Sequence, residues 1–234
     1  MRKSIMILLG VVNLLIACQN KNVSVQHETI VDIEHSSDTS ANTFSERKDD
    51  IINIPSSFCK VNLDSQKIIN KMAYATSENF TKQKLYPCAS CYLRNEVAIA
   101  LSKAQHGAQK MGLVLVVFDC YRPYSIQKKM FEIVGNSNYV AHPGKGSMHN
   151  KGCAVDVSLA EADGKLLDMG TEFDDFTEAA HFANTAINRL EHRNRKQLRD
   201  IMTSVGFLPY NNEWWHFNYL ITDSKTEDFV WSCP

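Results

Sequence analysis

Two short stretches of this sequence alternate between apolar and polar residues, and each carries a possible metal ligand within a predicted strand. The first is "CAVDVSL", residues 153–159. A period of two predicts one apolar core face and an opposite face on which Asp156 stands among small residues. The core face holds Val155, Val157 and Leu159, and the opposite face holds Ala154, Asp156 and Ser158.

The second stretch is "EWWHFNY", residues 213–219. The same period predicts a core face and a face that carries His216. The core face holds Trp215, Phe217 and Tyr219, and the opposite face holds Trp214, His216 and Asn218. If the two strands are neighbours in a sheet, Asp156 and His216 point toward the same place.

A second histidine comes just before the first strand. His149 lies in "HPGKGSMHNKG", a loop whose glycines (Gly144, Gly146 and Gly152) allow it to curl over a sheet. Two imidazoles and one carboxylate form a good tetrahedral set for zinc, with the fourth position open to water. His149, Asp156 and His216 are therefore the candidate metal ligands.

Glu213 stands three positions before His216, and an offset of three changes the face of a strand. We therefore expect Glu213 on the "NN" turn at 211–212 or on a bulge, beside the metal and not bound to it. That position suits a general base for a metal-activated water.

Spacing alone leaves a structural interpretation open for each of these residues. A lone histidine is commonly a surface or core residue, a strand aspartate commonly caps or pairs, and "EWWH" also fits an aromatic core strand. Arg122 in "FDCYRP", residues 118–123, presents the same choice. It follows a buried strand and precedes a proline-initiated helix, so it either holds an oxyanion in a cleft or pairs on the surface with Asp119.

The remaining patterns predict an α+β domain with a small sheet. Helices are expected where apolar residues recur at helical spacing, and strands where apolar residues alternate or form a continuous run. The expected helices span 64–75, 94–112, 123–134 and roughly 178–205, and the expected strands span 113–120, 154–159 and 213–219.

The N-terminal residues have the pattern of a targeting segment. Residues 1–18 combine a short basic start, an apolar run of 14 residues and "LIAC", which is typical of a bacterial lipoprotein signal with lipidation at Cys18. The run falls short of the ~20 residues that span a bilayer. Residues 19–55 are polar and read as a flexible tether, so the folded domain is expected at 56–234. Residue 19 is Gln, which gives no signal for retention at the inner membrane, so we expect an envelope protein that faces the periplasm, at the outer membrane.

Composition excludes one class of partner. A formal net charge of −1, with no basic stretch among aromatic residues, gives no reason to expect nucleic acid. An oxidising compartment permits disulfides among the six cysteines beyond Cys18, and "CASC" at 88–91 is better explained as structural than as a zinc or redox site. The six are Cys59, Cys88, Cys91, Cys120, Cys153 and Cys233, and their pairing stays open.

Several of these stretches resemble a known family. "SMHNKGCAVDV" matches Ser-x-His-x-x-Gly-x-Ala-x-Asp and "EWWH" matches Glu-x-x-His, the zinc motifs of the LD/DD-peptidases. Four more stretches narrow the resemblance to the VanX-type D-alanyl-D-alanine dipeptidases, over about residues 58–230. They are "YATSENFT", "DCYRP", "DMGTEFDDF" and "RKQLRDIMTSVGF".

The resemblance implies a role for each matching position. His149, Asp156 and His216 would bind one Zn²⁺, Glu213 would be the base, and Arg122 would stabilise the oxyanion. Ser147, Tyr74 and Asp174 would contact the dipeptide, with Asp174 binding its ammonium. The family fold is a small α+β domain with helices beside an antiparallel sheet and zinc above it, as in hedgehog and DD-peptidase domains.

The activity that follows is zinc-dependent hydrolysis of D-alanyl-D-alanine, in the metabolism of the cell wall, by a lipid-anchored enzyme. Two rivals stay open at this point. One is a D,D- or L,D-carboxypeptidase that trims peptidoglycan stem peptides, against which Asp174 argues. The other is a zinc-containing binding module without catalysis, against which Glu213 and Arg122 argue.

Overall fold

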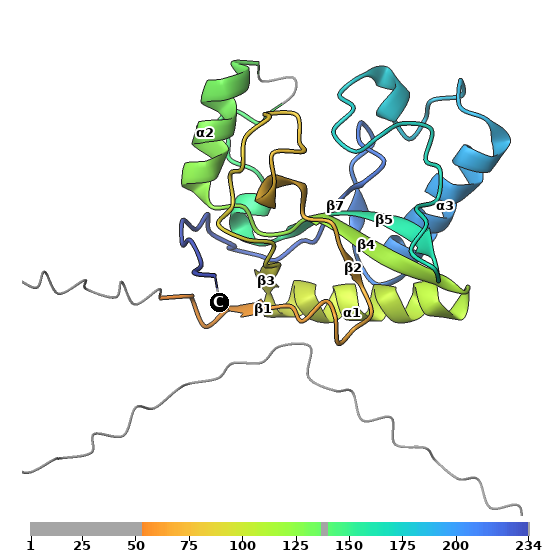
Figure 1. The fold of residues 1–234 in the computed structure, drawn as a ribbon. Coiled ribbons are helices and arrows are strands. Elements are labelled where there is room, and N and C mark those ends of the chain that lie inside the picture. The colour runs from red at the N-terminus through yellow and green to blue at the C-terminus, as the bar shows by residue number, and fades with distance from the viewer. Residues whose placement is uncertain (1–52, 137–139, 234) are drawn as a thin grey trace, which may run out of the picture.

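The computed structural model describes residues 53–136 and 140–233, and it has the α+β architecture that the sequence predicts (Figure 1). The strands are β1 (Phe58–Lys60), β2 (Ile69–Asn70), β3 (Tyr92–Arg94), β4 (Leu113–Asp119), β5 (Ala154–Glu161), β6 (Leu208–Pro209) and β7 (His216–Asn218). The α-helices are α1 (Asn95–Lys110), α2 (Tyr124–Val134) and α3 (Arg189–Ser204), and the 3-10 helices are η1 (Ala73–Ala75), η2 (His149–Lys151) and η3 (Glu178–Ala180).

The main sheet has five strands in the order β2-β4-β5-β7-β6. All neighbouring pairs are antiparallel except β2 and β4, which run parallel, so the predicted antiparallel sheet is mixed at one edge. β1 and β3 form a separate two-stranded antiparallel sheet. The condition under which Asp156 and His216 were expected to converge is met, because β5 pairs with β7 and these two residues stand opposite each other.

β4 and β5 form the buried centre of the sheet. The predicted core face of β5 is correct, since Val155, Val157 and Leu159 are fully buried. The opposite face of β5 is also covered, and Asp156 is only 3% exposed. In Figure 1, α1 runs along one side of the sheet, while the segments that carry η1 and η2 lie on the other.

Helix α1 forms where the sequence predicts it. Its buried residues Val97, Leu101, Ala104 and Ala108 recur at intervals of three and four, which gives one apolar face. The chain then leaves the helix through Gly112, which has a φ of 73°. β4 begins three residues after the end of α1, and α1 packs against β4.

The helix expected at 64–75 is wrong. Residues 69–70 form the edge strand β2, and only 73–75 form a single 3-10 turn. Lys67 has a φ of 56°, a left-handed conformation that no α-helix continues through. Pairing with β4 satisfies the backbone here, so contact with the sheet overrides the local helical spacing.

The helix expected at 178–205 is correct only in its second half. η3 and a loop occupy its first part, and α3 begins after Asn188. The Asn188 side chain accepts from the backbone N–H groups of Leu190 and Glu191, and the Glu191 carboxylate accepts in return from the Asn188 N–H. This capping box is a start signal that the apolar spacing does not reveal.

The strand expected at 213–219 shortens to three residues because 211–215 form a turn before it. Trp215 and Phe217 are in the core as predicted. Trp214, expected on the polar face, is buried as well, and its indole N–H donates to the Thr171 hydroxyl at 2.8 Å. The turn removes the strict alternation at this position.

The C-terminal segment after β7 returns across the molecule. The Phe229 ring stacks on Tyr121 with 4.2 Å between centroids, and Trp231 packs against Tyr86 at 5.2 Å. The Cys88–Cys233 disulfide ties this segment down, and a second disulfide joins Cys91 to Cys120. The two cysteines of "CASC" are thus structural, but each pairs with a distant partner.

The predicted signal and tether at 1–18 and 19–55 lie outside the described residues, apart from residues 53–55, which belong to the described chain. Among the helices that the structure describes, none combines the length and the apolar character needed to cross a bilayer.

Candidate metal centre and active site

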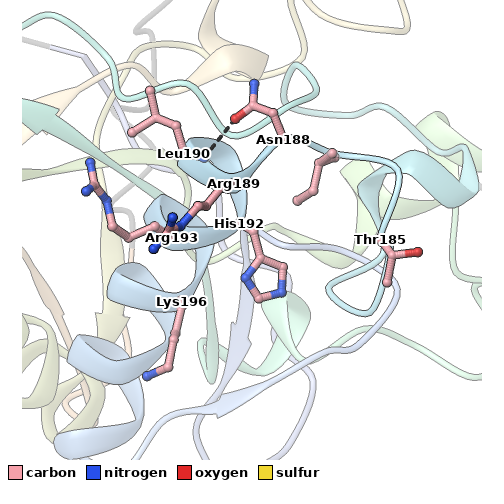
Figure 2. Close-up of a pocket in the computed structure, with 8 residues that line it drawn as sticks. Thr185, Asn188, Arg189, Leu190, His192, Arg193 and Lys196 are labelled. Carbon is pink, nitrogen blue, oxygen red and sulfur yellow. Dashed lines mark hydrogen bonds between the residues drawn. The ribbon is translucent and has the colours of Figure 1, made fainter.

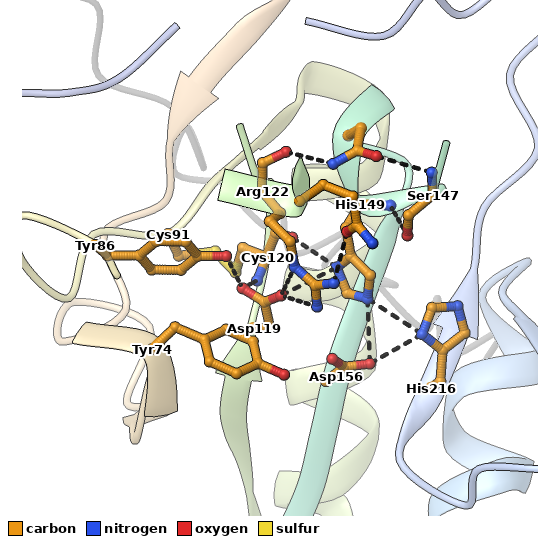
Figure 3. Close-up of polar contacts among 12 residues, drawn as sticks. Tyr74, Tyr86, Cys91, Asp119, Cys120, Arg122, Ser147, His149, Asp156 and His216 are labelled. Atoms are coloured by element: carbon orange, nitrogen blue, oxygen red, sulfur yellow. Dashed lines mark hydrogen bonds and ion pairs between the residues drawn. A yellow bond between two sulfur atoms is a disulfide. The ribbon is translucent and has the colours of Figure 1, made fainter. Parts of the chain in front are cut away.

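The three candidate ligands come together above the middle of the sheet (Figure 3). Asp156 points up from β5, His216 begins β7 opposite it, and His149 begins η2 in the glycine-containing loop. Asp156 Oδ1 lies 3.0 Å from His216 Nδ1 and 3.3 Å from His149 Nε2. The two imidazole nitrogens are 3.1 Å apart, so one atom from each residue forms a compact triangle.

The outer nitrogen of each imidazole is held by a hydrogen-bond acceptor. His149 Nδ1 lies 2.7 Å from the Cys120 carbonyl oxygen, and His216 Nε2 lies 2.9 Å from Asn218 Oδ1. A carbonyl oxygen only accepts, so each outer nitrogen carries a proton, and the inner nitrogen is the one that can present a lone pair to a metal once any proton of its own is lost. Metal-binding histidines are oriented in this way.

These donors fit a divalent cation such as zinc. Bonds of about 2.0–2.1 Å at tetrahedral angles place neighbouring ligand atoms about 3.3 Å apart, close to the separations in the triangle. Residues His149, Asp156 and His216 therefore have both the chemistry and the spacing of a metal centre that leaves a fourth position open.

The triangle holds charge even without a metal. Burial alone would lower the pKa of His216, but the hydrogen bond and the charge of Asp156 raise that pKa to about 9. Burial alone would raise the pKa of Asp156, and the two imidazoles outweigh it and lower the pKa below its ordinary value. Without a metal, the His216 proton supplies the positive charge beside the ionised Asp156, and a metal cation would take the place of this proton.

Glu213 stands at the turn before β7, as its offset from His216 predicts. Its Oε2 lies 3.8 Å from His216 Nδ1, beside the triangle and not part of it. Burial raises the pKa of Glu213 above its ordinary value, against the pull of the nearby His216. A carboxyl group with a raised pKa is better matched to accepting and returning a proton near neutral pH.

Arg122 is buried and aimed by two side chains. Its Nη2 and Nε donate to Asp119 Oδ2 at 2.7 and 3.1 Å, and its Nη1 donates to Gln127 Oε1 at 2.9 Å. Asp119 also accepts from the Tyr86 hydroxyl at 2.7 Å. The pairing with Asp119 is thus real, but it occurs in the interior and not on the surface, and Arg122 still lines the cavity next to His149.

Asp174 closes the opposite side of the cavity. The Tyr74 hydroxyl lies 3.1 Å from both carboxylate oxygens of Asp174 and donates to them. Asp174 has a φ of 62°, a left-handed conformation that is uncommon outside glycine. Burial, with the charge of Asp156, raises the pKa of Asp174 well above its ordinary value. Among the described residues no cation lies within 4.0 Å of this carboxylate, and the more distant charge of Arg122 does not outweigh its burial.

Ser147 belongs to the loop before His149. Its hydroxyl accepts from the His149 backbone N–H at 3.3 Å, and its own N–H donates to Asn150 Oδ1 at 2.8 Å. Ser147 lines the same cavity, which has a volume of about 270 Å³. The cavity brings all eight residues named above from the sequence motifs into one space. They are Tyr74, Arg122, Ser147, His149, Asp156, Asp174, Glu213 and His216.

A larger hollow of about 920 Å³ lies beside the first turns of α3 (Figure 2). Its charged side chains, Arg189, Arg193 and Lys196, are cationic. The hollow has no carboxylate or cysteine to complete a metal site, and its His192 stands alone. The smaller cavity is therefore the candidate site.

A family model described as D-ala-D-ala dipeptidase, Peptidase_M15, matches residues 61–228 of this chain. The chain belongs to this family. It is therefore a peptidase of a metallopeptidase family, as the motifs predict, and this membership argues against the non-catalytic binding module.

Two D-alanyl-D-alanine dipeptidases illustrate the similarity. The enzyme of Escherichia coli (strain K12) is 37% identical over 147 residues, which cover 63% of this chain and 76% of the relative. The enzyme of Enterococcus faecium is 32% identical over 186 residues, which cover 69% and 89%. Among solved structures, the LD-carboxypeptidase LdcB aligns with a TM-score of 0.41 and 24% identity, over 72% of this chain and 70% of that chain.

The matched segment of this family member contains all eight cavity residues that the motifs pick out. Apart from Asp119, which it offered as a partner of Arg122, the sequence did not identify the groups that orient them. Asn218 had a detectable signal, since it lies two positions after His216 on the same strand face. The Cys120 carbonyl, the Gln127 amide and the Tyr86 hydroxyl left no signal, because a backbone acceptor or a distant side chain is fixed only by the fold.

Proposed function

We propose that this peptidase is a zinc-dependent D-alanyl-D-alanine dipeptidase. The observation that carries the proposal is the convergence of three potential metal-ligand atoms beside Glu213 and Arg122, in a small cavity that the carboxyl group of Asp174 also lines. The names of the curated relatives support the substrate.

His149 Nε2, Asp156 Oδ1 and His216 Nδ1 would hold the zinc. Zinc bound there would supply Lewis-acid chemistry, polarising the scissile carbonyl and acidifying a water molecule. Glu213 takes the proton of the attacking water and delivers it to the amine that leaves, so its carboxyl group ends each cycle ionised. The raised pKa of Glu213 suits both transfers.

Arg122 supports the negative charge that develops on the carbonyl oxygen. Asp119 and Gln127 fix the guanidinium on one side, which leaves its remaining edge for the substrate. Burial opposes the charge of Arg122, but Asp119 outweighs it and raises the pKa of Arg122 further, so the guanidinium stays cationic during turnover.

Asp174 would bind the free ammonium of the dipeptide, with Tyr74 holding the carboxylate in place. An ammonium would supply the cation that the carboxylate lacks. A substrate whose amine is acylated, or that continues as a longer chain, has no such charge to offer. The site therefore favours a bare dipeptide over a peptidoglycan stem peptide.

We further propose that the enzyme acts in the cell envelope, attached by a lipid at Cys18. The lipoprotein signal at residues 1–18 supports this location. The two disulfides of the described residues are in keeping with an oxidising compartment. The substrate there would be dipeptide present in the envelope.

The substrate assay compares three compounds with the zinc-loaded protein. Release of D-alanine is followed from D-Ala-D-Ala, from its N-acetylated form and from a muropeptide that ends in D-Ala-D-Ala. We expect turnover of the free dipeptide alone. Turnover of the blocked or stem peptides in its place would make the enzyme a peptidoglycan carboxypeptidase.

The variant Glu213→Gln tests the base. We expect kcat for D-Ala-D-Ala to fall about 10²–10⁴-fold, because the amide cannot accept the proton of water. Bound zinc, measured by atomic absorption, should remain at one per chain, since Glu213 is not a ligand. Glu178→Gln, an exposed carboxyl group outside the cavity, is the control and should keep full activity. Loss of zinc from Glu213→Gln, or unchanged turnover, would overturn this role.

A further inference from the structure

The Cys91–Cys120 disulfide lies close to Asp119, to one side of the candidate metal centre (Figure 3). Cys120 is the residue whose carbonyl oxygen accepts from His149 Nδ1 at 2.7 Å. Both cysteines are buried, at 1% and 0% exposure, and the His149 side chain is buried as well. His149 Nδ1 also lies 3.6 Å from Asp119 Oδ2, so the Cys120 carbonyl is the nearer of two acceptors that orient the imidazole.

The peptide unit between Cys120 and Tyr121 is held on both sides. Its carbonyl contacts His149, and its N–H, which belongs to Tyr121, donates to the Tyr92 carbonyl at 2.9 Å. Tyr92 begins β3 and directly follows Cys91. The disulfide therefore runs alongside this hydrogen bond and joins the same two segments covalently, the start of β3 and the end of β4.

β3 also holds the turn that carries His149. The Arg94 backbone N–H donates to the Gly152 carbonyl at 3.1 Å, and Arg94 Nε donates to the Lys151 carbonyl at 2.7 Å. One short strand thus fixes η2, which carries the imidazole, while the disulfide fixes the carbonyl to which the imidazole donates. The separation of donor and acceptor depends on the link between β3 and β4.

We propose that the Cys91–Cys120 disulfide is a positioning element for the metal centre, which sets the orientation of the His149 imidazole and through it the affinity for zinc. The inference rests on the proposed function, since it takes His149 as a ligand. Groups that orient a metal-binding histidine commonly change metal affinity 10–100-fold when they are altered. The centre is then fully formed only in a compartment that allows the disulfide to form.

The chain supplies its own control, the Cys88–Cys233 disulfide. This bond closes a loop of 145 residues, whereas Cys91–Cys120 closes one of 29, so its removal is expected to destabilise the fold at least as much. Neither of its cysteines supplies an acceptor to a candidate ligand. A change of zinc affinity caused by general loss of stability should therefore appear in both variants.

The experiment compares wild type, Cys91→Ala/Cys120→Ala and Cys88→Ala/Cys233→Ala as full-length proteins. Zinc dissociation constants are measured by competition with a chromogenic chelator, at a temperature where urea unfolding shows that all three are folded. We expect about 10–100-fold weaker zinc binding in Cys91→Ala/Cys120→Ala and an unchanged constant in the control. If Cys91→Ala/Cys120→Ala does not fold, Cys91→Ala alone breaks the same bond with one sulfur removed, and the same loss is expected.

Nitrogen-15 NMR of the metal-free proteins gives a readout that does not depend on zinc. The His149 Nδ1 proton should exchange slowly in wild type and in Cys88→Ala/Cys233→Ala, and rapidly in Cys91→Ala/Cys120→Ala. Equal zinc affinity in all three proteins, or an equal loss in both variants, would overturn the inference and leave the dipeptidase proposal standing. Wild-type protein that binds no zinc would overturn both.

Discussion

At the scale of single residues, Asp174 is a site residue that we expect to lower the stability of the fold. Its carboxylate sits in a left-handed backbone conformation, is partly removed from water and lies in the field of Asp156. The Tyr74 hydroxyl provides the hydrogen bond that the structure describes for its side chain. Strain and an uncompensated charge at one residue are typical of a site that awaits a ligand.

Replacing Asp174 with Asn tests whether the carboxyl group lowers the stability of the fold while it contributes to substrate binding. Burial raises the pKa of Asp174, so the folded chain keeps this proton to higher pH than the unfolded chain. The free energy of unfolding of wild type therefore falls as pH rises from about 4 toward the raised pKa. Asn carries no such proton and tolerates the same backbone conformation, so the variant should gain stability over wild type as pH rises.

Urea unfolding of the metal-free proteins at pH 4, 6 and 8 measures this gain. The same variant should lose about 10–100-fold in kcat/KM for D-Ala-D-Ala, the value of a hydrogen bond to a charged group. Asp175→Asn, the neighbouring carboxylate outside the cavity, should change neither quantity in this way. A stability difference for Asp174→Asn that does not vary with pH would contradict the argument.

Individual side chains of the site could be predicted from the sequence because their chemistry is local. His149, Asp156 and His216 are recognisable from ligand type and from strand faces. Asp119 illustrates the limit, since its pairing with Arg122 was expected at the surface and occurs in the interior. Burial is a property of the whole fold, and the spacing of two residues does not report it.

At the scale of elements, the turn that carries His149 depends on Gly152. This glycine has a φ of 65°, and a Cβ built on it would lie 2.2 Å from Cε1 of the Phe58 ring. Its carbonyl also accepts from the Arg94 N–H, so the turn packs tightly against β3 and the Phe58 ring. Only glycine satisfies both the backbone conformation and the contact.

The variant Gly152→Ala should therefore lower the free energy of unfolding in two ways. A left-handed alanine costs roughly 1–2 kcal/mol, and the clash with Phe58 adds about 1–3 kcal/mol of overpacking. Gly135→Ala is the matched control, because Gly135 has a φ of 64° and no atom of the described residues lies within 4 Å of its added Cβ. Urea unfolding should show the first cost in both variants and the second only in Gly152→Ala, together with weaker zinc binding. Equal destabilisation would show that the Phe58 ring moves away freely.

Elements were predictable where one signal dominates. α1 and β4 follow from a long apolar face and a continuous β-branched run, and their bounds agree closely with the expected 94–112 and 113–120. The prediction of a helix at 64–75 was wrong because the chain forms an edge strand there and Lys67 has a left-handed conformation. Edge pairing depends on a partner strand far along the chain, and local spacing carries no record of it.

At the scale of the whole molecule, the sheet acts as the frame that joins distant motifs. β5 pairs with β4 on one side and with β7 on the other, so the ends of three strands deliver Arg122, Asp156 and His216 to one cavity. The C-terminal segment then packs behind the site, where Trp231 contacts Tyr86 and Tyr86 donates to Asp119.

The proposed lipid attachment belongs to a different part of the chain, and this separation leads to the last prediction. In a bacterial host, the full-length protein should partition into the detergent phase of a Triton X-114 extract, because lipidated Cys18 provides stable anchoring. Cys18→Ala should not be processed or lipidated, so labelled palmitate should enter wild type alone. Both proteins, purified in detergent and loaded with zinc, should share one kcat/KM for D-Ala-D-Ala, since Cys18 lies far along the chain from every cavity residue.

Palmitate incorporation into Cys18→Ala would show that lipid is attached elsewhere, and its absence from wild type would contradict the lipoprotein signal. A fall in kcat/KM with the loss of the lipid would mean that the N-terminal segment contributes to the site.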